Sequence, residues 1–176
     1  MMKHTALLTA VIMMGLFFSA CHKENFHYEK DFDKSYNTFL RFKNTTGNSY
    51  TYTVVGGSWT GYGWQTTLKV SSGIVVERYF KMTPPPGVPT QIPATELEWT
   101  EPSAQVGIHA LGAAAEPITL DEIYHRAKTD WLMKRAGVKT YFEAKNNGMI
   151  SDCGYVPDNC QDDCFRGISI AQIRAL

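Results

Sequence analysis

Three consecutive segments in the first half of the chain constrain its fold more than any other feature. Residues 49–55, SYTYTVV, are β-branched or aromatic, which favours a strand. In the next segment Trp64, Leu68 and Val70 share one face and polar residues occupy the other. A Ser-Ser-Gly turn follows, and residues 74–82 return as a third strand. The pattern therefore predicts an antiparallel meander.

Two helices are expected beside this meander. Aromatic residues recur at helical spacing from Phe32 to Leu40, which predicts a short N-terminal helix. The main helix should begin at Thr119, where Thr-Leu-Asp-Glu forms a capping box, and end at Gly137. Its predicted buried stripe comprises Leu120, Ile123, Ala127 and Trp131.

Further strands are predicted over residues 95–99, 139–145 and 168–173, with the cysteine-rich segment between the last two as a loop. The chain is therefore expected to be an α+β protein with an antiparallel sheet of about four to six strands, one main helix packed on it and a short N-terminal helix. We expect a single domain over residues 32–176.

Residues 1–20 have the parts of an export signal. A basic head precedes an uncharged apolar run over residues 6–18, which is shorter than the roughly 20 residues that span a bilayer. The small residues Ser19 and Ala20 follow, and then Cys21. Phe18-Ser19-Ala20-Cys21 resembles a lipobox, the site at which the lipoprotein-specific signal peptidase cuts. The resemblance implies a signal peptide over residues 1–20, diacylglycerol and palmitate on Cys21, and a membrane contact through that lipid.

The residues after Cys21 indicate where the protein would reside. Residues 21–31 are expected to be a polar tether, and His22 rather than Asp follows the cysteine, so the outer membrane is favoured over the inner. The 17 basic residues balance 17 acidic ones without a basic cluster, which argues against a nucleic-acid partner.

Three cysteines remain if Cys21 carries lipid. In an oxidising envelope compartment we expect Cys153 to pair with Cys160 or Cys164, which would stabilise the loop by roughly 2–3 kcal/mol. A zinc site with a histidine is disfavoured because the cysteines are not close pairs. A redox role is disfavoured because the chain has no Cys-x-x-Cys motif.

The same segment is rich in aspartate. Carboxylate oxygens are the ligands that calcium prefers, although the spacing does not match the helix–loop–helix calcium motif. We therefore expect no cofactor and keep calcium as an alternative. The candidate calcium ligands are Asp152, Asp158, Asp162 and Asp163.

A glycine-rich loop carries two aromatic residues that are candidate binding residues. Trp59 and Tyr62 could stack on a sugar ring or a protein partner, or could fold back onto the domain. Trp64 is expected in the core. Asp121 and His125 lie on one helix face, but no recognisable nucleophile accompanies them, so we interpret them as a surface pair.

The order of the elements resembles a known family. A Tyr-x-Tyr-x-Val strand begins at Tyr50, a strand turns at Ser72-Gly73, a Thr-Leu-Asp-Glu-Ile-Tyr helix begins at Thr119, and a strand covers residues 138–143. This order is similar to a domain of unknown function in bacterial lipoproteins and other exported proteins. The resemblance implies a small α+β fold and no activity.

The sequence leads to one functional hypothesis and two alternatives. We expect a non-enzymatic, lipid-anchored envelope protein that binds another envelope protein or a glycan. The alternatives are a structural or assembly lipoprotein and a calcium-dependent envelope protein.

Overall fold

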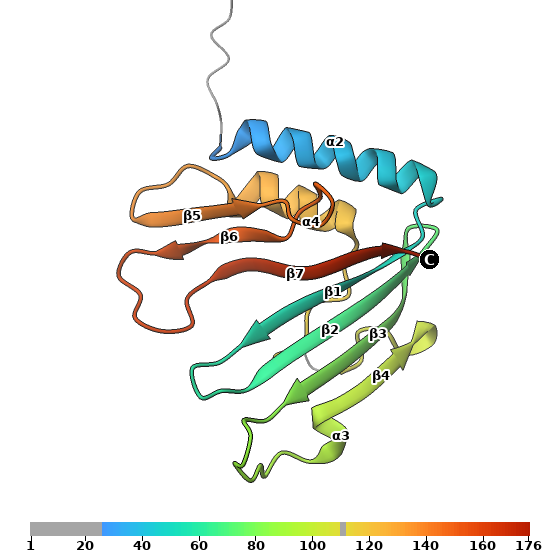
Figure 1. The fold of residues 1–176 in the computed structure, drawn as a ribbon, viewed down its shortest axis with the longest axis vertical. Helices are drawn as coiled ribbons and strands as arrows, with labels where there is room; N and C mark the ends of the chain where they lie inside the picture. The colour runs from blue at the N-terminus through green and yellow to red at the C-terminus, as the bar shows by residue number, and fades with distance from the viewer. Residues whose placement is uncertain (1–25, 110–111) are drawn as a thin grey trace, which may run out of the picture.

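The computed structural model describes residues 26–109 and 112–176, here called the described residues. Seven strands form one open antiparallel sheet in the order β4-β3-β2-β1-β7-β6-β5 (Figure 1). The chain up to Pro102 contributes β1 (Tyr50–Gly57), β2 (Gly63–Ser71), β3 (Ile74–Thr83) and β4 (Glu98–Pro102). The chain after it contributes β5 (Val138–Glu143), β6 (Asp152–Pro157) and β7 (Arg166–Ala175). The α+β class is confirmed, and so is the antiparallel meander of β1, β2 and β3.

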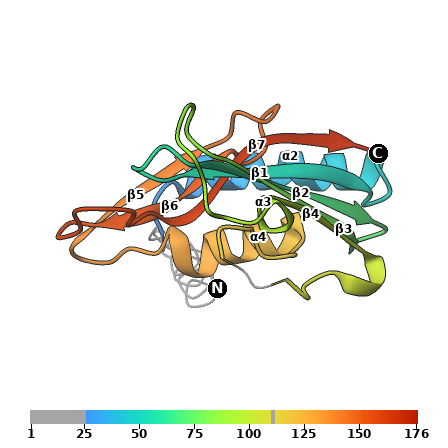
Figure 2. The ribbon, with the colours of Figure 1, turned by 90° about the horizontal axis from the view of Figure 1, so that it is seen from below.

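Both predicted helices are present. α2 (Glu29–Thr45) lies alongside the β5 end of the sheet in Figure 1. α4 (Leu120–Arg126) continues into one π-helical turn, η2 (Ala127–Trp131), and lies on one side of the sheet when the molecule is seen from below (Figure 2). The predicted cap is confirmed, because the Thr119 hydroxyl accepts the Glu122 amide at 3.3 Å. The short α3 (Ala94–Leu97) and η1 (Ser103–Gln105) flank β4.

Several element boundaries differ from the predictions. The sheet has seven strands rather than four to six, because β6 lies in the segment that we predicted to be a loop. The strand predicted over residues 95–99 begins only at Glu98, after a helical turn that Pro93 precedes. The main helix ends at Trp131, before Gly137. Leu120, Ile123 and Ala127 are buried as predicted, and Trp131 is half-buried against them.

The folded part extends further toward the N-terminus than expected. Phe26 is buried at 2% exposure and α2 begins at Glu29, both within the stretch 21–31 that we predicted to be a tether. Cys21 and the predicted signal peptide lie outside the described residues. Within the described residues, none of the helices has the length and apolar character needed to cross a membrane.

β7 exchanges pairing partners along its length. From Arg166 to Ser169 it pairs with β6, and from Ile170 to Ala175 it pairs with β1. The β1–β7 register shifts at Thr53/Val54, so one additional β7 residue is inserted there. Ile168, Ile170 and Ile173 are therefore all buried, although strict alternation would expose Ile173.

Tyr124 connects the helices to the sheet. Its ring stacks on Phe39 of α2, with 5.0 Å between centroids. Its hydroxyl shares a 2.7 Å hydrogen bond with Ser35 and accepts the Ile150 amide at 3.0 Å. Burial raises the pKa of Tyr124 to about 12, so the hydroxyl stays protonated. One side chain thereby joins α2, α4 and the turn before β6.

Arg78 and Glu101 form a fully buried ion pair between β3 and β4. They face each other in register, and Arg78 donates to the carboxylate from Nε at 2.8 Å and from Nη2 at 2.9 Å. Arg78 also donates to the carbonyls of His109 and Ala115, each at 3.1 Å. Glu101 accepts the amides of Gly107 and His109. These bonds hold the segment after β4 against the sheet.

Removal of one partner of this pair should be more damaging than removal of both. Arg78→Leu should lower the free energy of unfolding by about 3–5 kcal/mol, because it leaves a buried carboxylate without its counter-charge. Urea denaturation measures this loss. The matched control is the double variant Arg78→Leu, Glu101→Leu, which should lose less. An equal or greater loss in the double variant would contradict the interpretation.

The same pair should make stability depend on acid pH. Burial opposes ionisation of Glu101, but Arg78 and the Gly107 and His109 amides outweigh it and hold the pKa of Glu101 at about 2, below the ordinary 4.5. A lowered folded-state pKa contributes stability above the unfolded pKa, and this contribution is lost as pH falls toward the folded value. The free energy of unfolding should therefore decline from pH 4.5 to pH 2 more steeply in the natural chain than in Glu101→Gln. Urea denaturation at each pH measures this free energy. An equal decline in the two proteins would contradict the role assigned to Glu101.

Candidate functional site

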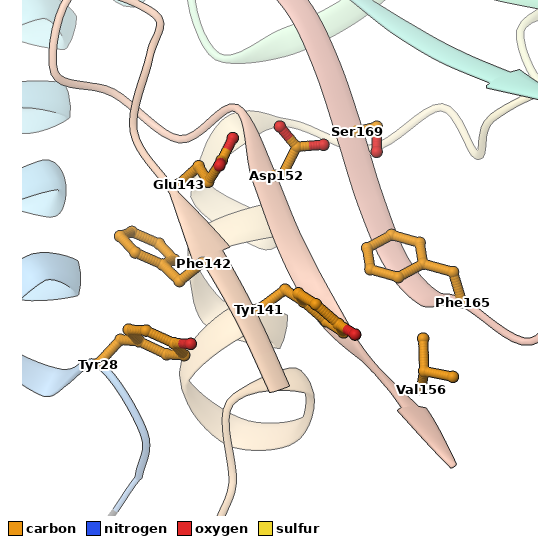
Figure 3. A pocket seen from close by; sticks show the side chains of 8 residues that line it. All are labelled: Tyr28, Tyr141, Phe142, Glu143, Asp152, Val156, Phe165 and Ser169. Atoms are coloured by element: carbon orange, nitrogen blue, oxygen red, sulfur yellow. The ribbon is translucent and has the colours of Figure 1, made fainter. Parts of the chain in front are cut away.

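An open groove of about 530 Å³ crosses the sheet face that points away from α4, over β5, β6 and the start of β7 (Figure 3). We call it the outer-face groove. It combines aromatic rings with two carboxylates and the hydroxyl of a serine. Its lining consists of Tyr28, Tyr141, Phe142, Glu143, Asp152, Val156, Phe165 and Ser169.

Strand register places the polar groups in a row. Phe142 packs against the core, so its neighbours Tyr141 and Glu143 point to the opposite face of β5. Glu143 lies opposite Asp152 on β6, and Asp152 lies opposite Ser169 on β7. Side chains in register on adjacent strands are within contact range. Two carboxylates and a hydroxyl therefore meet at one end of the groove, as Figure 3 shows.

A glycine lets two aromatic walls approach the floor of the groove. Tyr141 lies opposite Gly154, and the Phe165 ring covers that glycine. A Cβ on Gly154 would lie 2.6 Å from Phe165 Cζ and would also collide with the Arg166 carbonyl oxygen. Only glycine at position 154 therefore allows the Phe165 ring to pack this closely against β6.

The three aromatic rings remain accessible to solvent. Tyr28 is 43% exposed, Tyr141 36% and Phe165 41%. The Tyr28 hydroxyl donates to the Thr140 carbonyl of edge strand β5 at 3.2 Å, which fixes this ring beside the sheet. Large exposed rings that cluster in a hollow are typical of binding sites rather than of ordinary surface.

Nearby lysines moderate the charge of the groove. Lys145 pairs with Glu143 at 2.6 Å, and both side chains are largely exposed. The Lys139 ammonium lies 5.4 Å from the Tyr141 ring centroid. Asp152 has no such ion pair within the described part of the chain. The groove can therefore accept hydrogen bonds through Asp152 and stack flat ligand faces on its rings.

The aspartates predicted as calcium ligands do not come together. Asp152 lines the groove, whereas Asp158, Asp162 and Asp163 lie beyond the end of β6, in the loop that leads to β7. Within the described residues, no three His, Cys, Asp or Glu side chains lie close enough to hold a metal ion.

The cysteines divide into an adjacent pair and an isolated thiol. Cys160 and Cys164 have Cα atoms 6.0 Å apart, a separation that a disulfide can bridge. Cys153 is fully buried on β6, opposite Phe142, and is not part of that pair. The arrangement favours pairing of Cys160 with Cys164 over the pairing with Cys153 that we expected, and the presence of a disulfide in this segment stays a prediction.

The predicted aromatic binding residues lie outside the groove. Trp59 is 80% exposed in the β1–β2 turn, and the Tyr62 hydroxyl donates to Thr90 Oγ1 at 3.1 Å. Trp64 is half-buried on the same face as the buried Leu68, with its ring over Gly56.

The residues predicted as a surface pair on the main helix do not pair with each other. Asp121 accepts a hydrogen bond from Lys43 of α2 at 2.5 Å, so it joins the two helices rather than contacting His125.

Sequence reasoning missed most of the groove. Tyr141, Glu143 and Phe165 were not singled out, because nothing local connects them. The alternation of residues 138–143 was a usable signal, since it places Tyr141 and Glu143 on the face away from the core. The position of Phe165 follows only from pairing between β6 and β7.

Comparisons with known proteins do not extend this description: no protein-family model, no curated protein and no solved structure matches the chain.

The cysteine arrangement can be tested directly. Mass spectrometry of the chain, alkylated under denaturing conditions without reduction, should recover Cys160 and Cys164 crosslinked to each other and Cys153 carrying the alkyl group. In the folded chain Cys153 should react slowly with iodoacetamide, because burial raises the pKa of its thiol far above the ordinary value and little reactive thiolate forms. A crosslink from Cys153 to either of the other two would contradict the arrangement.

Proposed function

We propose that this chain is a lipid-anchored, non-enzymatic protein of the cell envelope whose α+β domain binds a glycan in the outer-face groove. The anchor rests on the lipobox-like Phe18–Cys21, and the absence of Asp after Cys21 favours the outer membrane. The observation that supports glycan binding is the cluster of three exposed rings beside the row of Glu143, Asp152 and Ser169.

The chemistry of a sugar matches this cluster. A pyranose ring has an apolar face of C–H groups and a periphery of hydroxyls. The apolar face can bury surface on Tyr141 or Phe165, while the hydroxyls donate to the Asp152 carboxylate in charge-assisted hydrogen bonds. A volume of about 530 Å³ lies in the range of small-ligand sites, and an open groove lets a longer glycan continue beyond it.

An extended polypeptide is the main competing ligand, because the groove runs beside edge strand β5. Peptide binding at an edge depends mainly on backbone hydrogen bonds. The groove instead offers rings and carboxylates on the face of the sheet, and the Tyr28 hydroxyl already occupies the Thr140 carbonyl on that edge. The geometry therefore favours the glycan.

Removal of either aromatic wall should weaken glycan binding. We expect the full-length chain to bind at least one of cellohexaose, xylohexaose, maltohexaose and chitohexaose in isothermal titration calorimetry. Tyr141→Ala and Phe165→Ala should each weaken that binding about tenfold, because each removes one stacking surface.

Trp59→Ala is the matched control, since it removes an exposed ring outside the groove and should leave the affinity unchanged. Circular dichroism checks that each variant is folded. An absence of heat with every oligosaccharide, or an equal loss in Trp59→Ala, would overturn the proposal.

A further inference from the structure

A second groove lies along an edge of β7 that no described strand occupies. β6 pairs with β7 only as far as Ser169, and β1 pairs with the opposite edge of residues 170–175. At the point of divergence, the Asn146 side chain donates to the Ile170 carbonyl at 3.0 Å. Beyond Ile170 the edge facing away from β1 is left without a partner strand among the described residues.

The space beside this edge is a groove of about 490 Å³, which we call the β7-edge groove. The second half of α2 forms its far side, the turn before β6 closes one end, and the last residues of β7 form the near side. Its floor is apolar, because Met149 and Ile173 are buried at 3% and 7% exposure and Phe42 is half-buried beside them. An open strand edge beside an apolar floor is the geometry in which an extended peptide adds to a sheet.

The charges of the groove specify the peptide further. Arg41 on the α2 side and Arg174 on the β7 side both line it, and no acidic residue does. Arg41 donates to Thr38 Oγ1 at 3.0 Å, whereas the Arg174 guanidinium has no hydrogen-bond or ion-pair partner among the described residues. Guanidinium groups bind carboxylates in two-pronged hydrogen bonds.

We infer that the β7-edge groove binds an extended, acidic peptide segment of another protein. The segment adds alongside residues 171–175, places an apolar side chain over Met149 and Ile173, and presents carboxylates to Arg41 and Arg174. This site is separate from the outer-face groove and does not depend on glycan binding there.

The test begins from an unbiased probe. A phage-displayed library of random peptides of about eight residues, a common strand length, is selected on the full-length chain. Enriched sequences should alternate apolar and acidic residues. A synthetic peptide of an enriched sequence should bind in fluorescence anisotropy. Methylation of the alternate backbone nitrogens that face β7 should abolish binding, because it removes the N–H groups that donate to the strand edge.

Two variants locate the site. Arg41→Gln and Arg174→Gln should each weaken peptide binding about tenfold. Lys30→Gln and Lys128→Gln are controls with the same charge change outside the groove, and both should bind as the natural chain does.

Three results would overturn the inference. The first is no enrichment, or enrichment of basic peptides. The second is equal loss of binding in the lysine controls. The third is binding to phosphatidylglycerol vesicles that requires Arg41 and Arg174 while no peptide binds, since this would assign the groove to a lipid headgroup.

Discussion

The exchange of partners along β7 is the constraint on which the rest of the structure depends. β7 joins the two halves of the sheet, because it pairs with β6 through Ser169 and with β1 from Ile170 onward. β6 pairs with one edge of β7 over residues 166–169, and β1 pairs with the other edge over residues 170–175. Neither edge of β7 is therefore paired along its whole length. The inserted residue near Ile170 keeps three isoleucines in the core across this junction. A continuous ladder would cover the edge that now borders the second groove.

Both grooves follow from this junction, and they differ in charge. Ser169, the last residue of the β6 ladder, completes the polar row of the outer-face groove, and the residues just beyond it form the open edge. Two carboxylates line the first groove and two guanidiniums line the second. The equal numbers of acidic and basic residues in the whole sequence conceal this separation, because net charge carries no information about placement. The two surfaces therefore suit ligands of different chemistry.

Local patterns predicted the local structure, and long-range pairing determined the rest. The β1–β2–β3 meander and the Thr119 cap were visible in the sequence because turn residues, alternation and capping act over a few positions. β6 was missed because its sequence, Asp-Cys-Gly-Tyr-Val-Pro, contains residues that disfavour strands, and it is a strand through its neighbours β5 and β7. The candidate site depends on those same pairings. Asp152 was identified for its carboxylate, but its position beside Glu143 and Ser169 required the register.

The buried Arg78–Glu101 pair illustrates why such features escape sequence analysis. In the sequence, Arg78 and Glu101 look like ordinary charged residues on the exposed face of a strand. Lys81 and Glu98, on the same two strands, do form an exposed ion pair. Two apolar side chains of similar size would avoid the cost of desolvating both charges, so stability alone does not explain the pair. The apolar alternative would lack directional bonds to the His109 and Ala115 carbonyls and to the Gly107 and His109 amides. Those bonds specify where the segment after β4 lies on the sheet. We therefore interpret the pair as fixing where residues 107–109 and Ala115 lie over the core face of β2 and β3.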